Sequence, residues 1–299
     1  MTDSTIHIPV LLREILEYGK PQPGGTWMDG TGGGGGHSAA IAELLGPSGR
    51  LLTIDRDPAA AERLTRLLPH PPCAVKAASY DDAPELLQAL DWGPVDGILL
   101  DLGLSSDQLN DRERGFSFAT DGELDMRFDP TSGYPVWQWM NRVPERELAD
   151  VIYKYGEERF SRRIARRIVE HRMRNPIRTA AELRELIHRC VPSPKQSRLD
   201  PATRTFQALR IVINDELGIL ERAMMRLPDL LAPGGQLLVI SFHSLEDRIV
   251  KYAFRDDPRL EVVTRKPLTA SDVELEENHR ARSAKLRIAR RIDGNAGKD

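Results

Sequence analysis

Cysteine and long apolar stretches are scarce in this 299-residue sequence. Its two cysteines, Cys73 and Cys190, lie far apart, which rules out a disulfide framework and argues against a cysteine-based zinc site. No metal is therefore expected. No apolar run is long enough to cross a bilayer. The first seven residues lack a basic segment followed by an apolar one, so no signal peptide is expected. We expect a cytoplasmic protein without a membrane partner.

Net negative charge is also small, at −3, but this value conceals a strong asymmetry. Residues 159–210 contain 14 Lys and Arg against 4 Asp and Glu, and residues 279–291 contain 6 basic residues and no acid. The remainder of the chain is correspondingly acidic. Either segment alone could be an ordinary solvated helix face. Together they favour a basic surface whose partner is a polyanion such as nucleic acid.

Glycine is concentrated in one segment, residues 27–38, which reads WMDGTGGGGGHS. An apolar stretch precedes it, an alanine-rich helix follows, and Asp55 comes twenty positions after Gly35. This layout is typical of a nucleotide-type cofactor site, because glycines let the backbone approach a ligand and the later acid accepts hydrogen bonds from a ribose diol. No Gly-Lys-Ser/Thr ends the segment, which disfavours a P-loop NTPase. The spacing alone fits both dinucleotide and methyltransferase cofactors.

Strands and helices alternate along both ends of the chain. This alternation predicts an α/β fold with a mostly parallel, Rossmann-like sheet and helices on both faces. The expected strands are residues 26–29, 50–54, 73–77, 95–100, 237–242 and 285–290. Helices are expected over residues 38–45, 59–68 and 85–90, with Asp57 capping the second.

The alternation stops in the middle of the chain, where no convincing buried strand occurs. Residues 157–173 have the apolar period of an amphipathic helix, with arginines on the other side. Thr179 and Glu182 form a capping box that opens another helix, and a long helix is expected from residue 200 through Leu220. We therefore predict an inserted, mostly helical domain over residues 108–205, between the two parts of a cofactor-binding domain at 1–107 and 206–299.

Three acids, Asp29, Asp55 and Asp101, come at the ends of predicted strands. Ligands of open α/β sheets bind beyond the carboxyl ends of the strands, so these acids are expected around one crevice. Three carboxylates suit a cationic cofactor such as S-adenosylmethionine, whose sulfur carries a positive charge. No Tyr-x-x-x-Lys occurs in the sequence, so one common dehydrogenase acid–base pair is missing.

Long sequence blocks resemble those of the RsmH/MraW family, which methylates N4 of a cytidine in the decoding region of bacterial 16S ribosomal RNA. The resemblance covers nearly the whole chain and is far more specific than a Gly-x-Gly pattern. Its blocks are HIPVLL (7–12), DGTGGGGGHS (29–38), IDRDP (54–58), DGILLDLGLSS (96–106), RGFSF (114–118), LDMR (124–127), YGEERF (155–160), PATRTFQALR (201–210), SFHSLEDR (241–248) and RARS (280–283).

The resemblance implies S-adenosylmethionine as cofactor and a set of residues that contact it. This set is Gly35, Gly36, His37, Asp55, Tyr80, Asp101 and Gln108. Tyr80 stands where the family usually has Phe, and Gly32 and Gly34 replace a bulky and a basic residue, so we expect a more mobile loop before binding. Asp101 and His243 are the catalytic candidates, with a histidine in a capped loop as the alternative for His243. Residues 101–104 read DLGL where many N-methyltransferases have Asp-Pro-Pro-Tyr, so the catalytic role rests on position alone.

The inserted segment is the expected site of RNA recognition. Five arginines are the candidates for phosphate contacts: Arg159, Arg162, Arg163, Arg166 and Arg167. Four aromatic residues are either base contacts or part of a small helical core: Phe116, Phe118, Trp137 and Trp139.

The expected partner is 16S rRNA within the small ribosomal subunit, with a homodimer as a further expectation. Two alternative hypotheses are a DNA or protein methyltransferase on the same fold and a noncatalytic RNA-binding factor. Methylation at C5 of cytosine requires a thiolate, and Cys73 fits a buried apolar role better.

Overall fold

The computed structural model describes residues 9–68, 73–117, 122–192 and 200–292. The chain forms two compact units. The first combines Met1–Ser105 with Leu217–Asp299, and the second is Ser106–Glu216. The chain therefore leaves the first unit once and returns to it once, so the second unit is an insertion.

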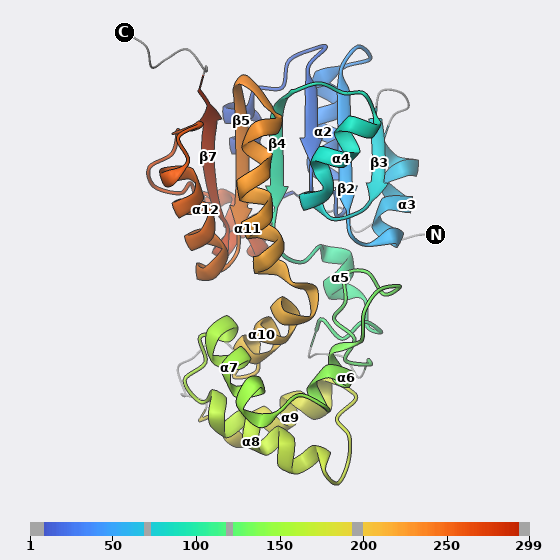
Figure 1. Cartoon of the computed structure of the whole chain (residues 1–299), viewed down its shortest axis with the longest axis vertical. Coiled ribbons are helices and arrows are strands. Elements are labelled where there is room, and N and C mark those ends of the chain that lie inside the picture. Colours follow the sequence, from blue (N-terminus) through green and yellow to red (C-terminus); the bar gives the residue numbers. More distant parts are fainter. Residues whose placement is uncertain (1–8, 69–72, 118–121, 193–199, 293–299) are drawn as a thin grey trace. The chain divides into compact units, whose positions relative to one another are not determined.

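A seven-stranded sheet forms the centre of the first unit (Figure 1). Its strands are β1 (Thr26–Asp29), β2 (Arg50–Asp55), β3 (Cys73–Ala77), β4 (Val95–Asp101), β5 (Leu231–Ser241), β6 (Leu260–Val262) and β7 (Lys285–Arg291). The strand order is β3-β2-β1-β4-β5-β7-β6, in which the pairs from β3 through β5 are parallel and β7 runs antiparallel to both neighbours. This order confirms the predicted Rossmann-like α/β sheet.

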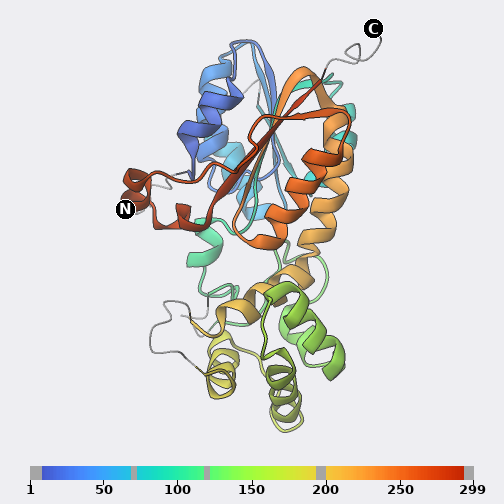
Figure 2. The same ribbon diagram turned by 90° about the vertical axis from the view of Figure 1, so that its left-hand side faces the viewer.

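Helices cover both faces of the sheet, and Figure 2 views the sheet nearly edge-on between them. One face packs against α1 (Leu12–Gly19), α2 (Gly36–Leu45) and α3 (Pro58–Leu67). The other packs against α4 (Ala83–Ala89), α11 (Glu216–Arg226) and α12 (Ser244–Asp256). The core is therefore a sheet buried on both sides, which explains the continuous apolar run of β4.

Close packing between β1 and β4 fixes the centre of the sheet. Trp27 is fully buried and is the register partner of Gly97. A Cβ at Gly97 would lie 2.3 Å from Cζ2 of the Trp27 ring, so only glycine leaves room for the indole there. The strand order reverses between these two strands, because β2 and β3 lie on one side and β5 on the other. In doubly wound sheets the ligand crevice lies at such a reversal.

The described part of the second unit is mostly helical. Its helices are α5 (Ser106–Asn110), α6 (Val136–Met140), α7 (Glu145–Gly156), α8 (Ser161–Arg172), α9 (Ala180–Cys190) and α10 (Thr203–Asn214). The predicted capping box at Thr179 is confirmed, with the side chain accepting a hydrogen bond from the Glu182 amide and Glu182 returning the contact. The unit extends to Glu216, beyond the predicted boundary at residue 205, because α10 packs against α7.

Two helix boundaries differ from the predicted ones. The helix expected over residues 157–173 begins only at Ser161, because Glu157 has a left-handed backbone with φ 49° and follows the end of α7. The long helix expected from residue 200 through Leu220 is interrupted at Asp215, also at φ 49°, which separates α10 from α11. At the end of α7, Gly156 permits a close helix crossing, since a Cβ there would lie 2.4 Å from the Arg204 carbonyl oxygen.

The aromatic residues of the insertion differ in how deeply they are buried. Phe116 is buried and its ring stacks on Phe128 at a centroid distance of 5.8 Å. Trp137 is partly buried beneath the Arg178 guanidinium, 5.0 Å from its ring centroid, and Trp139 is partly buried as well. Phe118 lies outside the described residues. A core role is therefore established for Phe116.

Candidate cofactor-binding site

The glycine segment forms a hydrogen-bonded loop between β1 and α2. The Gly30 amide donates to the Leu99 carbonyl at 2.9 Å, and the Gly32 amide donates to the Ile54 carbonyl at 2.8 Å. Gly35 has φ +84° and precedes the first turn of α2, a backbone conformation that favours glycine. The loop is thus bonded to both neighbouring strands, β4 and β2. Gly32 is also enclosed, since a Cβ there would lie 2.6 Å from Cγ2 of Thr53.

Asp55 ends β2 and connects that strand to the glycine loop. Its Oδ2 accepts a hydrogen bond from the Gly33 amide at 2.7 Å, and its Oδ1 accepts one from the Asp57 amide at 2.8 Å. Burial raises the pKa of this carboxyl above its ordinary value, although the two amides oppose the shift. Each oxygen has a second lone pair for a ligand donor. Asp55 therefore orders the loop and keeps capacity for the ribose contact that the sequence predicts.

Asp29 ends β1 and lies beneath the loop. It is almost fully buried, and its carboxylate accepts hydrogen bonds from the Ser38 hydroxyl at 2.6 Å and from the Thr31 amide at 3.0 Å. Burial raises the pKa of Asp29 to about 6, against the lowering effect of the Ser38 and Thr31 bonds. Asp29 therefore connects β1 by hydrogen bonds to the glycine loop and to the first turn of α2.

Asp101 ends β4 and differs from the other two acids in having no strong hydrogen-bond partner. Its Oδ1 is fully buried and accepts no hydrogen bond from any described residue. Its Oδ2 lies 3.6 Å from Nδ1 of His37, and the side chain as a whole is 20% exposed. Burial, together with the negative charges of Asp29 and Glu246, raises the pKa of Asp101 to about 8. An unsatisfied buried oxygen beside a crevice is typical of a ligand site.

His37, in the first turn of α2, is oriented by a backbone contact. Its Nε2 lies 2.9 Å from the Val10 carbonyl oxygen, which can only accept a hydrogen bond, so Nε2 carries the hydrogen. In the neutral ring Nδ1 is then the acceptor that faces Asp101. Sequence reasoning singled out His37 but missed Val10 as its orienting partner, because nothing local to Val10 signals that contact.

Replacement of Asp101 by a neutral side chain is expected to stabilise the ligand-free protein. The folded-state pKa of about 8 exceeds the ordinary 3.8, so the folded chain holds the proton more tightly. Stability is therefore lost as the pH rises from about 4 to about 8 and changes little above that. Asp101→Asn should raise the free energy of unfolding at pH 8 by about 2 kcal/mol, less than the full shift implies because the side chain is partly exposed.

Urea unfolding of the wild type and the variant, each at pH 5 and pH 8, measures this effect. The advantage of Asp101→Asn should be larger at pH 8 than at pH 5. If Asp101→Asn is less stable than the wild type at pH 8, the Asp101 carboxylate stabilises the folded protein and the expectation is wrong.

His243 follows β5 and caps α12. Its Nδ1 accepts a hydrogen bond from the Glu246 amide at 3.4 Å, while Oε2 of Glu246 accepts from the Phe242 and His243 amides. Nε2 lies 3.1 Å from Oε1 of Glu246 without hydrogen-bond geometry. The capping role is established, and a role in positioning the substrate base stays a prediction. Glu246 was missed by the sequence analysis, since a histidine in place of Ser or Thr hides the capping box.

The remaining cofactor candidates differ in their surroundings. Gly36 leaves no space for a side chain, since a Cβ would lie 2.9 Å from Cγ of Pro9. Tyr80 follows β3, is 9% exposed, and belongs to the hydrophobic core that contains Leu100 and Leu102. Gln108 lies in α5 of the second unit and is buried. The first unit therefore contains the glycine loop, Asp55, Asp101, His37 and Tyr80. Gln108 belongs to the second unit.

The five arginine candidates lie on or just before α8, and all five are exposed. Ile164, Ala165 and Ile168 form the buried face of the same helix. Arg166 lies 3.9 Å from Glu145 and Arg167 lies 3.1 Å from Glu170, so these two have acidic partners. Arg162 and Arg163 form no ion pair with any described residue. They are the strongest candidates for contacts with phosphate.

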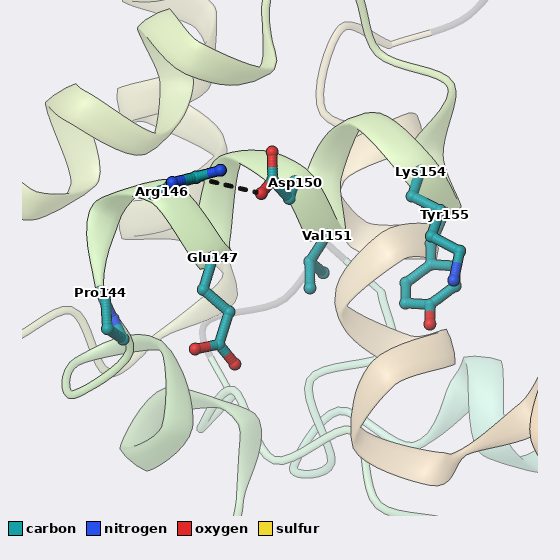
Figure 3. A pocket seen from close by; sticks show the side chains of 7 residues that line it. All are labelled: Pro144, Arg146, Glu147, Asp150, Val151, Lys154 and Tyr155. Carbon is teal, nitrogen blue, oxygen red and sulfur yellow. Dashed lines mark ion pairs between the residues drawn. The ribbon is translucent and has the colours of Figure 1, made fainter.

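A shallow pocket of about 390 Å³ lies along α7 (Figure 3). Its charged lining is balanced, because Arg146 and Lys154 are offset by Glu147 and Asp150, with Arg146 and Asp150 forming an ion pair. None of the residues that the sequence predicts to be functional lines it. No acid of the strand ends lines this pocket, and its balanced charge would not attract a polyanion.

In the described ranges, no group of three or more His, Cys, Asp or Glu side chains is arranged to hold a metal ion. Among the helices of the same ranges, none combines the length and the apolar character that crossing a membrane requires.

Comparison with known proteins gives close relatives. Residues 4–292 match the model of the MraW methylase family. The ribosomal RNA small subunit methyltransferase H of Rhodopirellula baltica is 50% identical over 300 residues, which cover 97% of this chain and 92% of that protein. The protein of the same name from Acidobacterium capsulatum is 48% identical, covering 95% of this chain and 97% of that one. A solved S-adenosylmethionine-dependent O-methyltransferase from Thermotoga maritima is 11% identical, covering 98% of this chain and 69% of that one, with a TM-score of 0.43, too low to support an inference.

The strand ends described above fit the cofactor of such an enzyme. Oδ1 of Asp101 is buried without a partner, which suits a cationic ligand, and Asp55 has lone pairs for a ribose. Gly35 and Gly36 leave no room for side chains where the loop enters α2. The chain belongs to the MraW methylase family, and it is a methyltransferase.

Proposed function

We propose that this protein methylates N4 of a specific cytidine in the decoding region of bacterial 16S rRNA, acting in the cytoplasm on the small ribosomal subunit. The observation that carries the proposal is the 50% identity, over 97% of the chain, to a protein named ribosomal RNA small subunit methyltransferase H. The blocks of sequence shared with the RsmH/MraW family support the finer assignment to N4 of cytidine. The basic insertion is consistent with an RNA substrate.

Asp101 is the proposed acceptor for the reacting amine. The exocyclic amine of cytosine is a weak nucleophile, because its lone pair is delocalised into the ring. The methyl group of S-adenosylmethionine is electrophilic because its carbon is bonded to a positively charged sulfur. A carboxylate that accepts an amine hydrogen strengthens the nitrogen as it becomes pyramidal. The unpartnered Oδ1 of Asp101 supports this role. His243, held by its capping contacts, is a secondary proposal for positioning the base.

The second unit is the proposed RNA-recognition part of the protein. The exposed arginines of α8, led by Arg162 and Arg163, would bind phosphates, and Arg159, Arg166 and Arg167 extend the same basic surface. Gln108 is proposed as a further cofactor contact, as the family resemblance implies. A homodimer is a separate proposal, which sedimentation of the purified protein would test.

Nucleoside mass spectrometry of 16S rRNA from a deletion strain tests the proposed reaction. N4-methylated cytidine should fall at one position in the deletion strain and return when the wild-type gene is restored, but not with Asp101→Asn. Methyl transfer in vitro should label assembled small subunits or naked 16S rRNA rather than DNA or protein. Unchanged rRNA nucleosides in the deletion strain would contradict the proposal, and label in DNA or protein would point to a different substrate.

A further inference from the structure

The surroundings of Asp101 are unusually poor in positive charge. The titratable groups that face it are Asp29 at the end of β1, Glu246 at the start of α12, and His37 in α2, with His243 next to Glu246. Asp29 and Glu246 both disfavour a second negative charge. Within the described ranges, no lysine or arginine forms an ion pair with Asp101. Among the described residues, an ionised Asp101 therefore has no lysine or arginine as a counter-ion.

The contact with His37 does not supply that counter-ion in the neutral ring. Nε2 of His37 is committed to the Val10 carbonyl at 2.9 Å, so Nδ1 faces Asp101 as an acceptor. A carboxyl proton on Oδ2 of Asp101 would point toward Nδ1 across 3.6 Å, a little longer than a hydrogen bond. Oδ1 stays buried without a donor. The geometry suits a neutral carboxyl better than a carboxylate as long as no cation is present.

We propose that Asp101 is protonated in the free protein, ionises when S-adenosylmethionine binds, and is protonated again when S-adenosylhomocysteine has formed, so that its charge discriminates cofactor from product. This inference rests on the cofactor site proposed above. The two ligands differ by one methyl group and one positive charge. Among the described residues, Asp101 is the acid of the cluster with a buried, unpartnered oxygen, which suits a cationic ligand.

The raised pKa of Asp101, about 8, agrees with this geometry. At pH 7 about nine tenths of the free protein would carry the proton. Asp29, with a pKa of about 6 and two hydrogen-bond donors, would be mostly ionised at that pH. The proton that binding displaces would therefore come from Asp101.

The charges balance through one turnover. The amine nitrogen forms a bond to the methyl carbon, the carbon–sulfur bond breaks, and its electron pair stays on sulfur, which becomes neutral. The methylated nitrogen loses one proton, and Asp101 takes up one proton. When the next S-adenosylmethionine binds, Asp101 releases that proton to solvent, so each cycle yields one proton overall. The neutral pair of product and protonated Asp101 lacks the ionic attraction that holds the cofactor, which favours product release.

Calorimetric titration in buffers of different ionisation enthalpy counts the protons directly. At pH 7 the wild-type protein should release about one proton per S-adenosylmethionine bound and almost none per S-adenosylhomocysteine. The ratio of the two affinities should shift about tenfold in favour of S-adenosylmethionine between pH 7 and pH 9, and level off above pH 9. Equal proton counts for the two ligands, with a ratio that does not change with pH, would overturn the proposal.

Two variants and one control separate this role from a merely structural one. Asp101→Asn should abolish both the proton release and the pH dependence of the ratio. Glu246→Gln keeps an acceptor for the α12 cap but removes a negative charge, so the pH dependence should move to lower pH. Asp96→Asn, at the opposite end of the same strand, should behave as the wild type, since Asp96 contacts the Thr26 amide. Proton release that persists in Asp101→Asn would contradict the assignment.

The experiments distinguish an error in the proposed function from an error in the proposed charge coupling. If S-adenosylmethionine binds with proton release but no rRNA is methylated, the substrate assignment is wrong and the charge coupling stands. If rRNA is methylated and binding releases no proton, the coupling is wrong and the function stands.

Discussion

Asp55→Ala is expected to weaken the binding of S-adenosylmethionine about a hundredfold. The variant loses an acceptor for the ribose hydroxyls, each such charged hydrogen bond contributing about 1.5 kcal/mol or more. It also removes the acceptor of the 2.7 Å hydrogen bond from the Gly33 amide, so the glycine loop keeps only its Gly32 contact among these two bonds to β2. Calorimetric titration of the variant with S-adenosylmethionine measures the change. An affinity equal to that of the wild type would contradict the ribose assignment.

Asp57→Ala is the matched control for that experiment. Asp57 lies two positions further on, caps α3 through a 3.0 Å bond to the Ala59 amide, and is assigned no cofactor contact. Its loss should lower stability by about 1 kcal/mol and leave the affinity for S-adenosylmethionine within about twofold of the wild type. A comparable loss of affinity in both variants would mean that disturbance of the segment between β2 and α3, rather than the ribose contact, causes the effect.

Replacement of Arg162 and Arg163 by glutamine is expected to weaken binding of the small ribosomal subunit at least tenfold. Both side chains are exposed on α8, and a phosphate contact contributes through released counter-ions. The slope of log affinity against log salt should decrease by about 1 to 2. Filter binding of 16S rRNA or assembled subunits over a range of salt concentrations measures both quantities.

Arg13→Gln with Arg66→Gln provides the control of equal charge. These arginines are exposed on α1 and α3 of the first unit and each lies near a glutamate one helical turn away. Their replacement should change RNA affinity by less than the α8 pair. If both double variants lower the affinity and the salt slope equally, the effect comes from net charge, and α8 has no special part in RNA binding.

The parts of the fold that could be predicted depend on local signals. β1, β3 and the start of β2 follow from short apolar runs, and the three acids were expected at strand ends, where the structure has them. Asp57 and Thr179 were identified as caps from their own sequence neighbours, and both accept the expected backbone hydrogen bonds. These features need only information from within about four residues, which a single sequence contains.

Features set by packing between distant segments were not predictable. The left-handed residues Glu157 and Asp215 end helices at positions without glycine, so no residue type marks them. β6 has three residues, too few for a pattern, and exists because β7 pairs with it.

The chemistry of the site was predictable only in part, for the same reason. The sequence marked Asp101 by its place at a strand end. Its pKa is raised first by burial and then by the negative charges of Asp29, 72 positions earlier, and Glu246, 145 positions later, which only the folded chain brings near. His243 was expected as a candidate beside the base, whereas its capping of α12 needs the geometry of the loop after β5.

Hydrogen–deuterium exchange with and without S-adenosylmethionine tests the location of the cofactor most directly. We expect slower exchange over residues 30–38, 55–58 and 101–105, where the glycine loop meets the acidic strand ends, with no comparable change along α7. The same experiment with NADH should leave all of these segments unchanged. Protection confined to other parts of the chain, or protection of these segments by NADH and not by S-adenosylmethionine, would contradict the account.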